Sequence, residues 1–207
     1  IMDYAENSGL IEIHNCHKAR KSFHIEEAQN NPTIPPEELP RLVADMKQWL
    51  EEGKIQAKTY YLLGWSLLTG VRPAEAVSVE WGEIDWENAT WHIPAEKMKG
   101  RMNKKMPHSV PLSRQALEIL QNMREIGGRT FIFNSYANPK NPMSSETVNR
   151  VLNRNGYKDI LTAHGSRSIV RTYLAKQNVE RNTAEAVLSH KIKAPTIARI
   201  ILRSAFL

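Results

Sequence analysis

The sequence predicts a mainly α-helical fold that contains a small antiparallel β-sheet. Apolar residues recur at helical spacing along most of the chain, whereas strand-like runs are confined to two short segments, 90–94 and 108–112. One basic turn separates these segments, so we expect them to pair within the helical domain. A chain of 207 residues with 41% hydrophobic and 24% charged residues can bury a sizeable core.

The charge balance narrows the class of partner. Lysine and arginine number 28 against 22 acidic residues, which gives a net charge of +6 and an isoelectric point of about 9.4. This excess favours a polyanion, most simply nucleic acid, although ribosomal and membrane-surface proteins share it. The single cysteine, Cys16, cannot form an internal disulfide, which suits a reducing cytosol. The sequence shows neither a signal peptide nor an apolar run of about 18 residues, so we expect no membrane span.

The first 30 residues are expected to be the end of a preceding domain and its linker. Residues 1–24 begin with helical spacing, which Asn7–Gly9 interrupts, and residues 25–38 are polar and contain three prolines. We therefore expect residues 31–207 to form a second domain. Both ends of the chain resemble helix interiors, so we expect a fragment whose second domain is truncated at its C-terminus.

Helices are expected in succession after the linker. Pro35–Glu38 places prolines and acids in a first helical turn, and apolar residues then repeat at helical spacing to Leu50. A second apolar helix covers residues 58–68 and ends at Gly70, and Pro73 opens a third. Residues 77–81 either end this third helix or begin a strand.

Further helices follow the predicted hairpin. Ser113 is a typical N-cap for the next helix, residues 131–133 form a short buried segment, and residues 134–143 form a loop. A helix then runs from Ser144 to Leu152. The last helices are expected at residues 164–177 and 181–189, with another after Pro195.

The turn between the two strands is strongly basic. Five basic residues fall within nine positions, namely Lys97, Lys99, Arg101, Lys104 and Lys105. No acidic residue occurs between Glu96 and Glu118. A solvated hairpin tip is one interpretation. The other is a β-ribbon that lies against a DNA backbone, where a lysine can also give a proton to a departing oxygen.

Three short segments carry the remaining candidate chemistry: Thr69–Glu75 (TGVRPAE), His164–Arg167 (HGSR) and Leu188–His190 (LSH). Arginine presents a planar fork of donors that matches phosphate oxygens, and histidine moves protons near neutral pH. Each segment alone is weak, because an arginine paired with an acid and a histidine at a helix end are common structural features. Their order, taken with the basic hairpin, is a strong signal.

Spacing adds detail to two of these segments. Arg72 can pair with Glu75 three residues later, which would hold its guanidinium in place. His164 and Arg167 share one face of a helical turn, and the small residues Ala163 and Gly165 leave room for the close approach of a ligand backbone.

The order of these segments resembles the catalytic domain of tyrosine recombinases, the phage-integrase family. The chain is most similar to prophage and genomic-island integrases, over about residues 32–190. TGVRPAE resembles the family's first arginine box, IPAEKMK followed by PHSVPLS resembles its lysine-bearing hairpin, and HGSR and LSH resemble its second and third boxes. Ser166 departs from the pattern, because a large apolar residue is usual there. The resemblance implies that residues 1–30 are the tail of a core-binding domain.

The resemblance also implies a set of site residues. The implied catalytic residues are Arg72, Lys99, His164, Arg167 and His190, with Glu75 in support. The arginines would hold the scissile phosphate and stabilise its pentavalent transition state. The lysine would be the general acid for the 5′ oxygen, and the histidines would hydrogen-bond phosphate oxygens and assist proton transfer. The basic residues expected to contact DNA are Lys97, Arg101, Lys104 and Lys105. The resemblance implies no metal and no cofactor, because the arginines supply the positive charge.

The tyrosine nucleophile of the family has no counterpart in this chain. Related integrases show a tyrosine, one residue, an arginine and then an aromatic–leucine pair. Alignment of Arg203 and Phe206–Leu207 with that pattern places Ile201 at the nucleophile position. Three explanations stay open: the chain is a decayed integrase, the nucleophile lies in a segment outside this chain, or a helix is supplied in trans.

The resemblance implies site-specific DNA recombination or integration through a 3′-phosphotyrosine intermediate. The implied partners are double-stranded DNA attachment sites and further copies of the protein on DNA, in the bacterial cytoplasm and associated with the nucleoid. The alternative is a catalytically inactive remnant that acts only as a DNA-binding protein. A basic scaffold with no DNA role is a second alternative.

Overall fold

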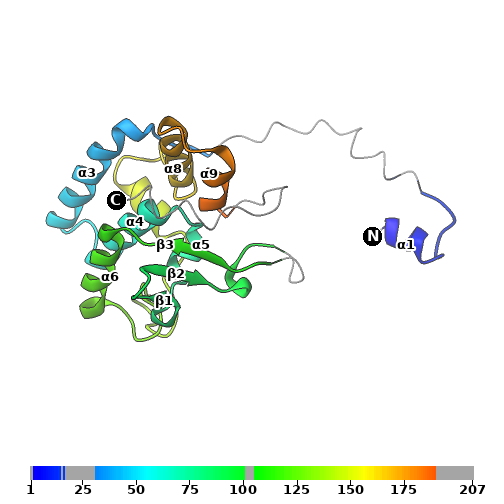
Figure 1. The fold of residues 1–207 in the computed structure, drawn as a ribbon, viewed down its shortest axis with the longest axis horizontal. Coiled ribbons are helices and arrows are strands. Elements are labelled where there is room, and N and C mark those ends of the chain that lie inside the picture. The colour runs from blue at the N-terminus through cyan, green and yellow to red at the C-terminus, as the bar shows by residue number, and fades with distance from the viewer. Residues whose placement is uncertain (1, 15, 17–30, 101–104, 190–207) are drawn as a thin grey trace. The chain divides into compact units, whose positions relative to one another are not determined.

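The computed structural model describes residues 2–14, 16, 31–100 and 105–189. It divides into two units, Ile1–Asn30 and Asn31–Leu207, which we describe separately (Figure 1). Within the described residues, no helix is long and apolar enough to cross a membrane.

In the described part of the first unit, helix α1 spans Met2–Asn7. Gly9 follows it in the left-handed conformation (φ 68°), so the expected helix stop is confirmed. His14 Nε2 lies 2.9 Å from a carboxylate oxygen of Asp3 and 3.1 Å from one of Glu6. This contact folds the chain after the helix back onto its side.

The second unit begins with an amphipathic helix followed by a largely buried helix, on which most of the other helices pack. A 3-10 turn, η1 (Pro36–Glu38), leads into α3 (Leu39–Glu51), which buries Leu42, Met46 and Trp49 at helical spacing. Helix α4 (Ala57–Thr69) follows and is buried over much of its length. Both helices confirm the elements expected from apolar periodicity.

The remaining helices are short or amphipathic. They are α5 (Pro73–Val77), α6 (Arg114–Ile126), α7 (Thr147–Arg154), α8 (Gly165–Lys176) and α9 (Arg181–Val187). Helices α5, α6, α7 and α8 contact α4, and α9 contacts α8. Ser113 Oγ accepts a hydrogen bond from the Ala116 backbone N–H (3.2 Å), which confirms Ser113 as the N-cap of α6. The helix expected after Pro195 lies outside the described residues.

A three-stranded antiparallel sheet lies beside α5 and α6 (Figure 1). Its strands, in the order β1-β2-β3, are β1 (Ile84–Asp85), β2 (Thr90–Ile93) and β3 (His108–Pro111), and two 3-10 turns, η2 (Trp81–Glu83) and η3 (Ala95–Lys97), flank the first two strands. The expected pairing of β2 with β3 is confirmed, with Trp91 opposite Val110 and Ile93 opposite His108. Residues 77–81 form no strand of this sheet, because α5 ends at Val77 and only Glu80 makes an isolated bridge to Phe131.

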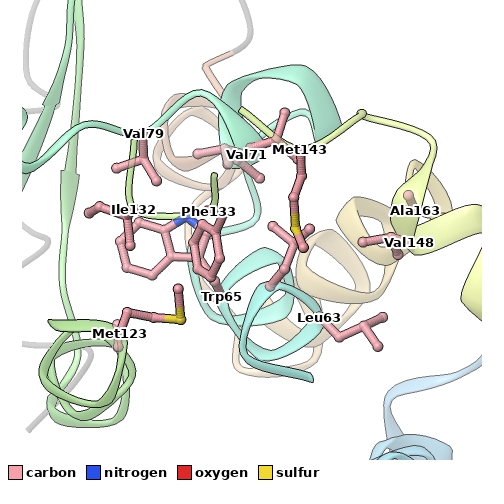
Figure 2. Packing of buried hydrophobic residues seen from close by; sticks show 14 of the residues in the cluster. Leu63, Trp65, Val71, Val79, Met123, Ile132, Phe133, Met143, Val148 and Ala163 are labelled. Carbon is pink, nitrogen blue, oxygen red and sulfur yellow. The ribbon is translucent and has the colours of Figure 1, made fainter. Parts of the chain in front are cut away.

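Trp65 of α4 lies at the centre of the core (Figure 2). Its ring centroid is 5.2 Å from that of Trp91 in β2 and 6.2 Å from that of Phe133. Met123 of α6 and Ile132 pack around the same indole (Figure 2). Each fully buried side chain of this kind contributes about 1.5–3 kcal/mol. The core therefore fixes α4, and with it the turn that follows α4.

Candidate active site

Arg72 lies where α4 gives way to α5. Gly70 ends α4 in the left-handed conformation (φ 60°), which glycine adopts without the strain that a Cβ brings. The Arg72 backbone N–H donates to Glu75 Oε2 (2.9 Å), and its guanidinium Nη1 donates to Glu75 Oε1 (3.0 Å). Glu75 is only 2% exposed. One buried carboxylate thus holds both the backbone and the side chain of Arg72.

Arg167 lies in the first turn of α8 and is 4% exposed. Its Nη1 donates to the Gly70 carbonyl oxygen (2.7 Å) and its Nη2 to the Leu188 carbonyl oxygen (2.6 Å). Burial and, to a smaller extent, the Arg72 guanidinium lower the pKa of Arg167 to about 10, against the opposing effect of Glu75. The guanidinium is therefore still cationic at neutral pH.

The third segment closes the site from the end of α9. Leu188 is buried, and Ser189 takes a left-handed conformation (φ 51°) that few residues with a side chain adopt. Ser189 Oγ accepts a hydrogen bond from Arg72 Nη1 (2.8 Å). The structure thus brings both arginines, Glu75 and the Leu188–Ser189 turn together from three distant parts of the sequence.

His164 is exposed directly before the start of α8, three residues before Arg167. Thr162 Oγ1 accepts a hydrogen bond from the Gly165 backbone N–H (2.9 Å), which fixes this helix start. The space beside Gly165 is not open to a ligand, so that expectation was wrong. A Cβ on Gly165 would lie 1.9 Å from the Pro32 carbonyl oxygen, because the protein's own chain occupies the space.

Ser166, which stands where a large apolar residue was expected, makes a buried hydrogen bond. The side chain is buried, and its hydroxyl donates to the Ala163 carbonyl oxygen (2.7 Å). It lines a small, mostly apolar cavity together with Leu42 and Leu152. A large apolar side chain at this position would point into the same space.

The basic turn contains lysines with very different surroundings. Lys97 Nζ lies 2.7 Å from Glu80 Oε1 and 2.5 Å from Glu83 Oε1, and it donates to the Ser78 carbonyl oxygen (2.6 Å). Two carboxylates neutralise this ammonium, so the geometry favours a structural role over the expected DNA contact. Lys99, by contrast, is exposed and lies beyond η3.

Of the remaining predicted site residues, only Lys105 lies among the described residues. Lys105 is half-buried and donates to the Glu96 carbonyl oxygen (2.7 Å). The rest lie outside the described residues, namely Arg101, Lys104, His190 and Ile201.

The sequence predicted His108 only as part of a strand and not as a residue near the site. His108 begins β3 and is half-buried, and the charged groups that act on it are Glu75, Arg72 and Arg167. The available signal was alternation, since His108 shares a strand face with the buried Val110.

The arrangement is suited to holding an oxyanion. Two guanidinium groups lie near one another, and one buried carboxylate orients the more accessible of them. Among residues 2–14, 16, 31–100 and 105–189, no group of three or more His, Cys, Asp or Glu side chains could hold a metal ion.

Comparison with known sequences gives consistent matches. Residues 32–199 match the model of the phage integrase family. The prophage integrase IntA of Escherichia coli K12 is 40% identical over 208 residues, which cover 100% of this chain and 48% of the relative. The integrase of Enterobacteria phage P4 is 31% identical over 202 residues, which cover 92% of this chain and 45% of the relative. The chain thus spans about half the length of the curated relatives it matches.

Solved structures share the fold. A λ integrase (75–356) dimer bound to a COC′ core site superposes with a TM-score of 0.62 at 19% identity, covering 94% of this chain and 70% of that one. The XerA recombinase superposes with a TM-score of 0.61 at 16% identity, covering 82% of this chain and 59% of that one. The predicted fold, mainly helical with a small antiparallel sheet, is confirmed as that of a tyrosine-recombinase catalytic domain. With a family match over most of its length and a relative at 40% identity, the chain belongs to the phage integrase family.

Proposed function

We propose that the second unit, residues 31–207, is the catalytic portion of a prophage-type integrase that recombines DNA at specific sites. The observation that carries this proposal is the meeting of Arg72, Arg167 and the Leu188–Ser189 turn above the buried Glu75. The first unit is then the tail of a core-binding domain.

The two arginines have the properties that a phosphate clamp needs. Arg167 is cationic although it is buried, so its charge acts in a low-dielectric environment where electrostatic stabilisation of a transition state is strong. Arg72 is partly exposed and oriented by Glu75, so it meets the incoming phosphate without reorganisation. Together they would stabilise the pentavalent transition state.

The remaining site residues would transfer protons and hydrogen-bond the phosphate. We assign Lys99 as the general acid that protonates the departing 5′ oxygen, and its exposure beyond the β2 strand supports access to DNA. His164, beside the Arg167 turn, would hydrogen-bond a phosphate oxygen, as would His190. The DNA-contacting basic residues are then Arg101, Lys104 and Lys105.

The substrate class follows from charge and from relatives. Related integrases have been solved as a dimer bound to a core site and as a tetramer bound to a Holliday junction. We propose that this chain likewise binds double-stranded attachment sites and associates with further copies on DNA, in the cytoplasm and at the nucleoid. The net charge of +6 supports a polyanionic partner.

Restoring the nucleophile tests the catalytic proposal. Ile201→Tyr should form a covalent adduct with nicked duplexes selected from a randomised pool, because the tyrosine hydroxyl would attack the phosphate held by the arginines. Ile200→Tyr is the matched control, since it adds the same hydroxyl one position out of register. Adding Arg167→Ala to Ile201→Tyr should slow adduct formation by about 100-fold or more. A denaturant-resistant adduct in the Ile200→Tyr control, or none in Ile201→Tyr, contradicts the proposal.

The second candidate function is DNA binding without strand transfer, which the isoleucine at position 201 favours. Both functions require binding that weakens as salt rises, with a slope of about 0.9 per phosphate contact. Arg72→Ala should lower this slope by about one if Arg72 contacts a phosphate. Salt-dependent binding by every variant with no adduct from Ile201→Tyr would support the second function. Binding that is independent of salt would rule out both.

A further inference from the structure

Arg72 shares one of its guanidinium nitrogens between two acceptors of the protein. Its Nη1 donates to Glu75 Oε1 (3.0 Å) and to Ser189 Oγ (2.8 Å). A guanidinium has five N–H donors, and Nη1 carries two of them. Both donors of Nη1 are therefore committed to the protein before any ligand arrives.

The other three donors of Arg72 belong to Nε and Nη2. Among the residues that the structure describes, none accepts a hydrogen bond from either nitrogen, and the side chain is 21% exposed. Nε and Nη2 present the parallel pair of donors that can bind two oxygens of one phosphate. The contacts at Nη1 thus leave one bidentate edge of Arg72 for an oxyanion.

The two acceptors of Nη1 hold the arginine in different ways. Glu75 lies three residues after Arg72 and also accepts the Arg72 backbone N–H through Oε2 (2.9 Å), so it holds the side chain close to its own backbone. A single contact at Nη1 still lets the guanidinium turn about that contact. Ser189, 117 residues away in the sequence, supplies a second fixed point that stops this rotation.

The backbone of Ser189 does not itself favour a serine. Its φ of 51° lies in the left-handed region, where a Cβ is disfavoured and glycine is not. The turn is held from the preceding residue, because the Leu188 carbonyl oxygen accepts a hydrogen bond from Arg167 Nη2 (2.6 Å). A side chain that persists in an unfavourable backbone conformation within a site points to a function of that side chain. For Ser189, the contact with Arg72 supplies it.

We propose that Ser189 is a positioning residue that fixes the rotation of the Arg72 guanidinium, so that its Nε–Nη2 edge binds two oxygens of one phosphate. This role rests on the phosphate-binding function proposed above. Without the hydroxyl, the guanidinium would have to be ordered when the phosphate arrives, which weakens binding. Ser189 thus acts on the phosphate through Arg72.

Sulfate titrations followed by NMR test this role on the full chain. Sulfate is the probe because it is a tetrahedral oxyanion, and sodium chloride at equal ionic strength controls for screening. Ser189→Gly and Ser189→Ala both remove the hydroxyl, whereas only alanine keeps a Cβ at this φ. Asn178→Gly is the matched control, because it places glycine at another left-handed position (φ 57°) and leaves the Arg72 contacts intact.

We expect both Ser189 variants to weaken sulfate binding equally, by about 2- to 12-fold, which is the usual penalty for ordering one long side chain on binding. Asn178→Gly should leave the affinity unchanged. Arg72→Ala should weaken binding as well. Adding Ser189→Gly to Arg72→Ala should then have no further effect, because the hydroxyl acts only through the guanidinium.

The guanidinium NMR signals give a readout that a purely structural role would not change. Rotation about the Nε–Cζ bond averages the Nη1 and Nη2 signals of a loosely held arginine, whereas an anchored arginine shows them separately. Arg72 should show separate signals in the unmodified chain and move towards a single signal in Ser189→Gly. Arg167 is the internal control, since it donates to two backbone carbonyls and should keep separate signals in both proteins.

Several results overturn the inference, and they differ in what else they overturn. If Arg72→Ala weakens sulfate binding but Ser189→Gly does not, or Asn178→Gly weakens it equally, Ser189 is structural only and the phosphate clamp stands. The same holds if Ser189→Gly acts as strongly in the Arg72→Ala background as alone. If neither Arg72→Ala nor Arg167→Ala weakens sulfate binding, the phosphate clamp itself is wrong, and the role of Ser189 falls with it.

Discussion

Replacing Gly165 by alanine tests how the start of α8 is positioned. A Cβ at this residue would lie 1.9 Å from the Pro32 carbonyl oxygen, where ordinary contact begins at 3.4 Å. The chain at Pro32 must therefore retreat by about 1.5 Å. Two hydrogen bonds hold it in place, from the Thr162 backbone N–H to the Pro32 carbonyl oxygen (3.2 Å) and from Thr33 Oγ1 to the Gly165 carbonyl oxygen (2.9 Å).

The expected loss of stability follows from these contacts. Each hydrogen bond contributes about 1 kcal/mol, and forcing a methyl group into a packed site costs about 1–3 kcal/mol. We expect a total of about 3–5 kcal/mol, which corresponds to a fall in Tm of about 6–20 °C for a domain of this size. Sulfate affinity should fall as well, because the displaced turn carries Arg167.

Thermal unfolding followed by circular dichroism measures the effect. Gly82→Ala is the matched control, because a Cβ there meets nothing within 4 Å. The control should unfold at the temperature of the unmodified chain. A Gly165→Ala variant that unfolds within about 2 °C of this control would refute the reasoning, since the Pro32 segment would then yield without loss.

Three further outcomes test other contacts. Lys97→Met should destabilise the fold by about 1–2 kcal/mol in denaturant unfolding, because two carboxylates lose their common cation, whereas the exposed Lys99→Met should have no effect. Ser189→Gly should be more stable than Ser189→Ala by about 1 kcal/mol, since both lack the hydroxyl and only alanine keeps a Cβ at φ 51°; equal melting temperatures would contradict this. The pKa of His108 is lowered by burial in the folded chain, so its contribution to stability is complete above pH 6.5 and declines as pH falls below that value. His108→Gln should flatten this part of the stability–pH curve, and parallel curves would contradict the assignment.

Local sequence signals were sufficient for most elements of the fold. Apolar periodicity places α3 and α4, Gly70 marks the end of α4, and Ser113 marks the start of α6. Strand β1 escaped prediction because two residues, Ile84–Asp85, are too few to show alternation. Its pairing depends on β2, which only the tertiary structure reveals.

The site was less predictable, because its geometry depends on neighbours remote in sequence. The pairing of Arg72 with Glu75 is local and was anticipated. The count of lysines in the hairpin could not show that Lys97 is held by carboxylates well before it in the chain. The sequence could not show whether a ligand or the protein's own chain fills the space beside Gly165, because that depends on the position of Pro32. Similarly, alternation in β3 identifies His108 as inward but not what lies beneath it.

The long span of the arginine contacts has a consequence for synthesis of the protein. The bond from Arg167 to Gly70 joins residues 97 positions apart, and the bond from Arg72 to Ser189 joins residues 117 apart. A nascent chain that has emerged only as far as α6 or α7 holds Arg72 and Glu75 but none of the groups that complete the clamp. The proposed phosphate site is therefore complete only when residue 189 has left the ribosome.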